Sequence, residues 1–253
     1  MPLQTRTGLG LAPAGELTLP PPYTPVRLRE FGDAFEQAKA LAPERGAGTL
    51  TYVGRFDLAE FALVLEPEEP LRQARRAFYA GMAALADALA ALAEPETAIN
   101  IDWPDTLTVN FGLVGGGRLA WPQGAREDAV PDWLVFGAMI RTASVPGAEP
   151  GANPNVTALD EEGFGETLSS HVVESFARNF MVALDAWQES GIGAVAKSYF
   201  DYFPREQGLR RDIDDNGDLL LRRMAAPDVE RLALLPRLTE PAWYDPKAKG
   251  PRA

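Results

Sequence analysis

Residues 99–121 read INIDWPDTLTVNFGLVGGGRLAW, and this stretch decides the fold. Apolar residues at alternate positions, such as Ile99 and Ile101, are typical of a half-buried strand. Pro104 cannot donate a hydrogen bond to a strand ladder, so it predicts a strand end or a bulge. Residues 115–117 are three glycines, which let a ligand or another strand approach the main chain. The stretch therefore predicts strand, tight turn, strand, glycine-rich bend and strand.

The composition is that of a soluble globular protein. The chain has 253 residues, 46% hydrophobic and 24% charged, which allows one large domain and a small one. Its net charge of −12 argues against nucleic-acid binding, which needs a basic face. We find no apolar run of about eighteen residues and no secretory-signal pattern, so we expect no membrane span and a cytoplasmic location. The absence of cysteine and the single histidine, His171, exclude disulfides and multi-histidine metal sites, and we predict no metal ligands.

The apolar patterns on both sides of the glycine run predict further elements. Strands are expected over residues 49–53, 58–65 and 132–141, and helices over residues 29–41, 69–92, 169–187 and 192–203. Asn216-Gly217 predicts a hairpin, which could form a small β module with residues 229–238. We therefore expect an extended arm over residues 1–27 pinned by Leu17, Leu19 and Tyr23, a main domain over 28–204, and a β-rich module with a tail over 205–253.

Two segments of the opening stretch resemble motifs of a known family. Asp102-Trp103-Pro104-Asp105-Thr106 resembles the Lys-Trp-Pro-Asn-Asp motif of biotin protein ligases and of the wider biotin/lipoate ligase family. Leu113-Val114-Gly115-Gly116-Gly117 resembles their Lys-Val-Gly-Gly-Ile motif. Residues 46–52 fall where the family has a Gly-Arg-Gly-Arg-x-Gly-Arg loop, and residues 135–141 where it reads Val-Ile-Gly-Ile-Gly-Ile-Asn. The resemblance covers residues 28–238 and implies an α/β fold, a mixed sheet backed by helices, with a small C-terminal β module.

The resemblance also implies a reaction. Ligases of this family join a carboxylic acid such as biotin or lipoate to ATP, release pyrophosphate, and pass the acyl group to a lysine of a carrier protein. It therefore implies ATP and magnesium as cofactors, biotin or lipoate as substrate, and a biotinyl or lipoyl carrier domain as partner. Members of the family often form homodimers. Because two negatively charged reactants must meet, the site needs cations where charge develops.

The cationic residues of the family are not retained in this chain. The lysine before Trp-Pro falls on Asp102 and the lysine before Val-Gly-Gly on Leu113. The loop arginines fall on Ala47, Thr49 and Tyr52. Loss of one such donor typically lowers the rate by about 10² to 10³. The Asn-Asp pair falls on Asp105 and Thr106, and the late asparagine on Arg141, so that one carboxylate remains for a metal.

These correspondences define the candidate site. The predicted catalytic residues are Arg118 and Asp105. The predicted ligand-binding residues are Gly46, Gly48, Thr49, Trp103, Gly115, Gly116, Gly117 and Arg141. Arg118 and Arg141 could hold a carboxylate or phosphate bidentately, or could form structural ion pairs with Asp102 or Asp105. Trp103 could stack on a ligand or belong to the core.

Two functions remain open. The first is a diverged ATP-dependent ligase. The second is a catalytically inactive ligase-fold protein, a pseudoenzyme, that binds a small acidic ligand or a protein partner. Function depends on the site and not on the fold. The missing lysine and arginine residues favour the second function, or a reaction without adenylation.

Overall fold

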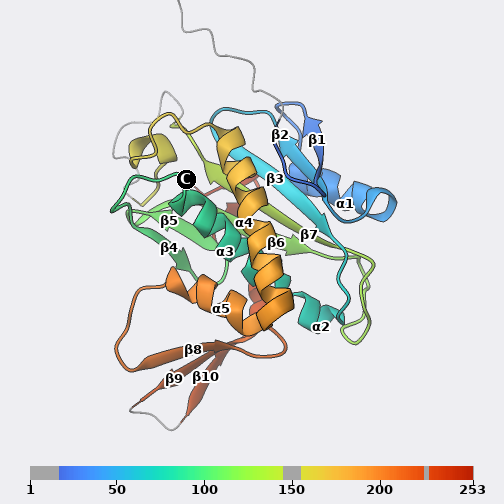
Figure 1. Ribbon diagram of the computed structural model, residues 1–253, viewed down its shortest axis with the longest axis vertical. Coiled ribbons are helices and arrows are strands. Elements are labelled where there is room, and N and C mark those ends of the chain that lie inside the picture. Colours follow the sequence, from blue (N-terminus) through green and yellow to red (C-terminus); the bar gives the residue numbers. More distant parts are fainter. Residues whose placement is uncertain (1–16, 145–154, 225–227, 253) are drawn as a thin grey trace, which may run out of the picture.

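The computed structural model describes residues 17–144, 155–224 and 228–252. Its centre is a seven-stranded mixed sheet (Figure 1) in the order β1-β2-β3-β7-β6-β5-β4. These strands are β1 Thr24–Leu28, β2 Thr49–Val53, β3 Leu58–Leu65, β7 Leu134–Arg141, β6 Gly112–Ala120, β5 Thr106–Val109 and β4 Ile99–Asp102. Among the described strands of this sheet, β1 and β2 pair in parallel and all the other neighbours pair antiparallel. The mixed sheet predicted from sequence is confirmed.

Helices cover both faces of this sheet. They are α1 Ala34–Arg45, α2 Leu71–Ala74, α3 Ala77–Ala90, α4 Ser169–Ser190, α5 Ile192–Asp201 and α6 Leu234–Thr239, with a 3₁₀ turn at Leu159–Glu161. In β3 the alternate residues Phe61 and Leu63 join the core under α3 and α4, whereas Ala62 and Val64 pack towards α1. This alternation makes β3 apolar throughout, because both of its faces are buried. In the described part of the chain no helix is both long and apolar enough to cross a bilayer.

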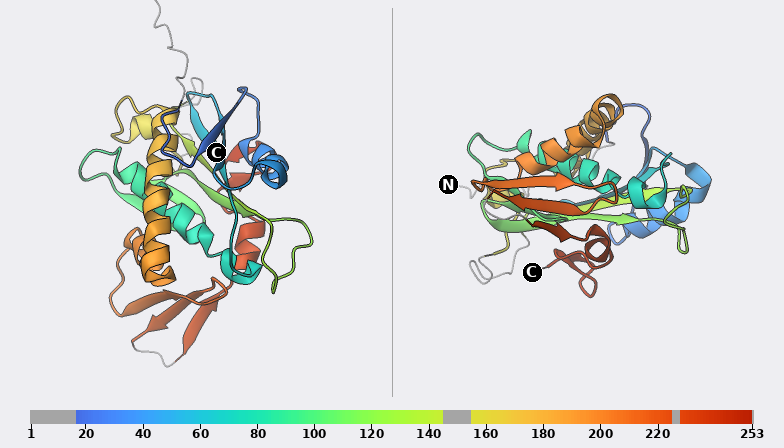
Figure 2. Two further views of the ribbon diagram at one scale, coloured as in Figure 1. Left: turned by 45° about the vertical axis from the view of Figure 1, so that its right-hand side comes forward. Right: turned by 90° about the horizontal axis from the view of Figure 1, so that it is seen from below.

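The C-terminal part of the chain forms two structures. β8 Leu209–Ile213, β9 Leu219–Arg223 and β10 Val229–Leu232 form a three-stranded antiparallel sheet, so the predicted hairpin at Asn216-Gly217 is confirmed. The chain then returns through α6 to the large sheet, on the face opposite α4 (Figure 2, right). There it forms a small hairpin of β11 Tyr244–Asp245 and β12 Gly250–Pro251. The domain boundary near residue 205 stays a prediction.

Three predicted elements need correction. The predicted extended arm contains β1, because residues 24–28 pair with β2, although Leu17, Leu19 and Tyr23 do pack on the core as expected. The helix predicted over residues 69–92 is divided at Arg75 and Arg76, whose guanidinium groups pair with Glu127 and Glu69. Residues 234–239, predicted as part of the β module, form α6. The prediction for residues 1–16 lies outside the described residues.

The glycine run is also not a bend. Gly115, Gly116 and Gly117 lie inside β6 and pair with β7. The chain instead turns between β5 and β6 at Asn110 and Phe111, whose φ angles are 47° and 71°.

Candidate functional site

The surface of the sheet above the glycine run is covered by the protein itself. The C-terminal segment (residues 240–252) lies on this face, and Trp243 is buried against Gly116. The Trp243 indole Nε1 donates a hydrogen bond of 2.9 Å to the Gly117 carbonyl oxygen. A Cβ atom at position 116 would overlap this indole and the Asp105 carbonyl oxygen. The glycine therefore permits close approach, as the sequence predicts, but the group that approaches is Trp243.

Asp105 anchors the same segment. Its side chain is 1% exposed, and its Oδ2 atom accepts a hydrogen bond of 2.9 Å from the Ala242 N–H. Its Oδ1 atom accepts one of 3.0 Å from the Thr106 hydroxyl. Burial raises the pKa of Asp105 to about 6, although these two hydrogen bonds oppose the increase. Asp105 thus holds the C-terminal segment, and both of its oxygens are engaged.

Arg141 has a similar role at the other end of the segment. Its Nη2 atom donates to the carbonyl oxygens of Pro251 at 2.8 Å and Arg252 at 2.6 Å. Burial lowers the pKa of Arg141 from its ordinary value. The two arginines of the candidate site therefore do not converge on one ligand, because the guanidinium of Arg141 binds main-chain carbonyls.

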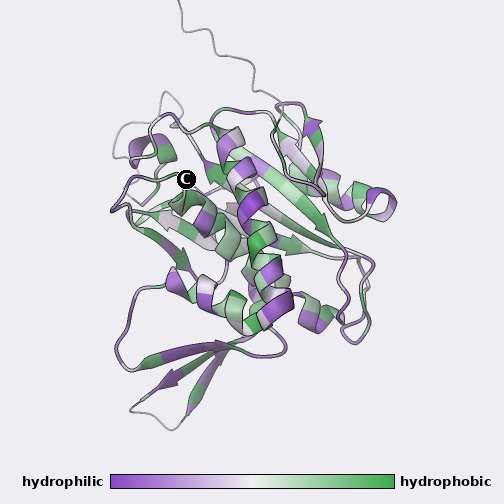
Figure 3. Cartoon of the chain, viewed as in Figure 1, coloured by the Kyte–Doolittle hydropathy of each residue, from purple (hydrophilic) through white to green (hydrophobic). Residues whose placement is uncertain are grey.

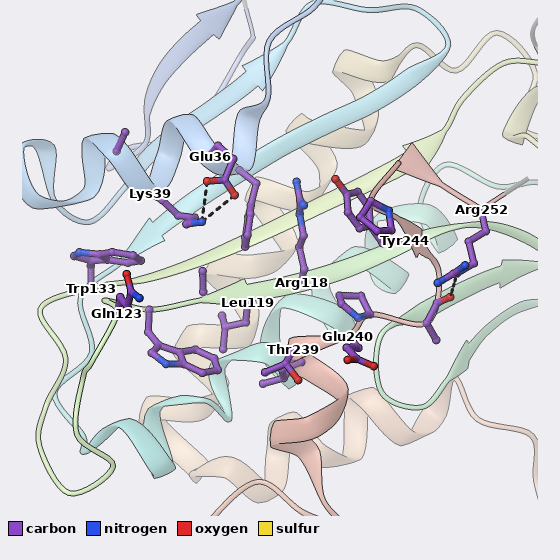
Figure 4. A pocket seen from close by; sticks show the side chains of 18 residues that line it. Glu36, Lys39, Arg118, Leu119, Gln123, Trp133, Thr239, Glu240, Tyr244 and Arg252 are labelled. Carbon is purple, nitrogen blue, oxygen red and sulfur yellow. Dashed lines mark hydrogen bonds and ion pairs between the residues drawn. The ribbon is translucent and has the colours of Figure 1, made fainter. Parts of the chain in front are cut away.

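An open cavity of about 1170 Å³ lies beside the C-terminal segment, between α1 and the end of β6 (Figure 4). Its walls are partly aromatic, with Phe35, Trp121, Trp133 and Tyr244 among them. Its charged side chains are the cations Lys39, Arg118 and Arg252 and the carboxylates Glu36 and Glu240. The cavity thus has more cationic than anionic groups, although the chain as a whole has a net charge of −12.

Arg118 is the cation at the base of this cavity. Its side chain points away from β6 between α1 and Tyr244 (Figure 4). The guanidinium carbon lies 4.1 Å from the centroid of the Phe35 ring and 4.6 Å from that of Tyr244. Its Nη2 atom is 3.5 Å from the Oδ1 atom of Asp33, the residue that caps α1. Stacking between the two aromatic rings fixes the plane of the guanidinium. Its N–H groups lie in that plane and point outwards from the group's edge.

The Arg118 guanidinium makes an ion pair but no hydrogen bond within the described residues. The residue is only 9% exposed, and its ion-pair partner in the described part of the chain is the Asp33 carboxylate, at 3.5 Å. The nearby Glu60 carboxyl is engaged by the Ala34 N–H at 2.9 Å. Burial raises the pKa of Glu60, and the positive charge of Arg118 opposes the increase. An almost buried guanidinium with one long ion pair and no hydrogen bond within the described residues is a suitable site for a carboxylate.

The other predicted site residues lie away from the cavity. Gly46 caps the end of α1, and Gly48 and Thr49 lead into β2, where Thr49 is buried. Trp103 packs on the core and donates to the Tyr79 hydroxyl at 3.3 Å. None of these residues, and none of Gly115, Gly116, Gly117, Asp105 and Arg141, lines the cavity. These glycines serve here for turns and for close packing, and a ligand-binding role for them stays a prediction.

The residues present do not fit the triphosphate and metal implied by the resemblance. Residues 49–52, matched to the glycine–arginine loop, are a buried strand. The link between β2 and β3 spans only residues 54–57, and its single arginine, Arg55, makes two hydrogen bonds to Asp57, at 2.9 Å and 2.6 Å. Asp105 is enclosed, and in the described ranges no three acidic or histidine side chains are placed to hold a metal ion.

Sequence reasoning missed several residues that form the site. Phe35, Tyr244 and Trp243 surround Arg118 and the glycine run, and Asp33 pairs with Arg118. Asp33 lies inside the helix predicted over residues 29–41, whereas α1 begins at Ala34 and Asp33 is its cap, a position that aspartate favours. The adjacent aromatic residues 243 and 244 are unusual for a solvated tail and could have been noted as a packing signal.

Comparison with known proteins agrees with the fold and the sequence motifs. Residues 19–201 match the model of the Biotin/lipoate A/B protein ligase family. A biotin–[acetyl-CoA-carboxylase] ligase of Paracoccus denitrificans is 28% identical over 186 residues, which cover 66% of this chain and 75% of that protein.

Solved structures are similar as well. A biotin protein ligase-like protein of unknown function from Silicibacter sp. TM1040 is 26% identical, with a TM-score of 0.72 over 85% of this chain and 96% of that one. The apo biotin protein ligase of Aquifex aeolicus, at 13% identity, has a TM-score of 0.64 over 83% and 95%, which supports the fold alone. The matched model covers more than half of the sequence, and the chain therefore belongs to the Biotin/lipoate A/B protein ligase family.

Proposed function

We propose that this protein binds a small carboxylic acid with an apolar body and does not adenylate it. The observation that carries the proposal is Arg118, a stacked and almost buried guanidinium beside an aromatic-walled cavity, whose ion pair with Asp33 is long at 3.5 Å. A planar guanidinium matches the two oxygens of a carboxylate. Trp121 and Trp133 offer apolar surface for the rest of such a ligand.

The lack of adenylation follows from what the chemistry requires. Joining a carboxylate to ATP brings negative groups together and needs several fixed cations. Leu113 and Asp102 stand at the two lysine positions of the family, and Arg55 is engaged by Asp57. A surviving ATP-dependent ligase that acts on a carrier-protein lysine is the second candidate, and only family membership favours it.

Binding of biotin, lipoate and octanoate to the purified protein, measured by calorimetry without nucleotide, tests the proposal. A hydrogen bond to a charged group contributes about 1.5–3 kcal/mol. For whichever acid binds the wild type, we therefore expect Arg118→Gln to raise the dissociation constant by about 10-fold to 100-fold. Arg126→Gln is the control, since Arg126 is exposed and pairs only with its neighbour Asp128.

A second comparison leaves the protein unchanged. The neutral amide of the same acid keeps the apolar body but cannot accept a bidentate pair as a carboxylate does. We expect the amide to bind wild-type protein at least about 10-fold more weakly than the acid. Equal binding of acid and amide, or no binding of any of the three acids, would count against the proposed role of Arg118.

A further inference from the structure

The three-stranded sheet of β8, β9 and β10 has two different faces. Ile213 and Leu219 lie directly opposite each other and are both buried, and Ile213 belongs to the main core. The other face carries the residues that alternate with these, and it is largely exposed. Figure 3 shows the small sheet, at the edge of the molecule, as mostly hydrophilic. The outward face consists of Arg210, Asp212, Leu220, Arg222, Val229 and Arg231, and is called the arginine face below.

Two arginines oppose each other on this face. Arg210 of β8 is the direct cross-strand partner of Arg222 of β9. Like charges in this position destabilise a sheet. Among the residues that the structure describes, no carboxylate lies within 4.0 Å of either guanidinium. The chain has 36 acidic and 24 basic residues. Carboxylates are therefore more numerous than basic groups, yet none of those described pairs with these two arginines.

The surroundings of this pair limit what could bind there. Arg231 is held at one end of the face by Asp214 at 2.9 Å and Asp218 at 3.6 Å. Val229, opposite Arg222, is 44% exposed and adds an apolar surface. Asp212 lies on the same face, but its Oδ1 atom accepts a hydrogen bond of 2.9 Å from the Ile213 N–H, and in the described residues it forms no ion pair with Arg210 or Arg222. The unpaired positive charge is thus local to Arg210 and Arg222 and lies next to an exposed aliphatic side chain.

We propose that the arginine face docks an acidic polypeptide segment of a partner protein. Carboxylates of the segment pair with Arg210 and Arg222, and an apolar side chain covers Val229. Charge complementarity favours this partner, because a carboxylate relieves the Arg–Arg repulsion. A nucleic acid is a weaker candidate, since it needs many phosphate contacts along a basic track and this chain is acidic overall. The proposal does not depend on the cavity or on its ligand.

The test uses the full chain and a fluorescein-labelled ten-residue peptide of alternating glutamate and valine, followed by fluorescence anisotropy. The variant is Arg210→Gln with Arg222→Gln, and the control is Arg126→Gln with Arg178→Gln, which removes two other exposed arginines. We expect the control to bind as the wild type does, and the Arg210/Arg222 variant to bind at least about fivefold more weakly. An alternating glutamine–valine peptide should not bind.

Stability provides an independent measurement. Arg210→Glu places a carboxylate opposite Arg222, so it should raise resistance to urea at low salt while it weakens peptide binding. Higher stability together with weaker peptide binding is expected if the two arginines serve binding, and not if they stabilise the fold. Equal peptide binding by the two double variants, no binding by the wild type, or tighter binding of a short DNA duplex than of the peptide would overturn the proposal.

Discussion

Asp105→Asn should make the protein more stable at neutral pH. Burial raises the pKa of the Asp105 carboxyl from its ordinary value of 3.8 to about 6. The folded chain therefore keeps a proton between about pH 4 and pH 6 that the unfolded chain has lost, so the free energy of unfolding falls as the pH rises through this window. The pKa of Asp105 is about two units higher in the folded chain than in the unfolded chain. This difference lowers the free energy of unfolding at pH 7.5 by about 3 kcal/mol.

Asparagine can keep both hydrogen bonds of Asp105. Its Oδ1 atom can accept from the Ala242 N–H, and its Nδ2 group can donate to the Thr106 hydroxyl oxygen. The charge is removed, so we expect the variant to exceed the wild type by about 1–3 kcal/mol at pH 7.5 and by less than about 1 kcal/mol at pH 4.

Urea denaturation at the two pH values measures this difference. Asp102→Asn, on the exposed side of the same turn, is the control and should change stability by less than about 0.5 kcal/mol. An Asp105→Asn variant that is less stable than the wild type at pH 7.5 would show that the ionised carboxylate is required, and would refute the reasoning.

Two further predictions concern the C-terminal segment. Gly116→Ala should lower the midpoint of thermal unfolding by several degrees, since the new Cβ would overlap Trp243 and the Asp105 carbonyl oxygen. The control is Gly193→Ala, which has open space around it and should be neutral or stabilising by up to about 1 kcal/mol. Arg141→Ala removes the donors to residues 251 and 252, so carboxypeptidase should trim the chain faster than in an Arg126→Ala control, and equal trimming would argue against this anchor.

Much of the large sheet could be predicted because its signals are local. The strands Thr49–Val53 and Leu58–Leu65 have the predicted limits, because short runs of apolar and β-branched residues lie between turn signals. The division between α2 and α3 could not be predicted, since the pattern of apolar residues continues across it. Arg75 and Arg76, at the division, pair with Glu127 and Glu69, and the periodicity does not encode these ion pairs.

The candidate site was predicted less well, for a similar reason. Arg118 does line the cavity, but the covering of Gly116 by Trp243 joins residues more than 120 positions apart. A glycine that admits a ligand and a glycine that admits a buried tryptophan give the same sequence signal. The motif positions therefore indicated the fold correctly but not which surface is open.

The central claim is that an acid is bound without being adenylated, and the most direct measurement is acid-dependent exchange of labelled pyrophosphate into ATP. The assay uses full-length protein with magnesium, ATP and each of biotin, lipoate and octanoate. We predict no exchange above the protein-free blank for any acid, including an acid that calorimetry shows to bind. Exchange that requires both the protein and one of these acids would contradict the account and establish a surviving ligase.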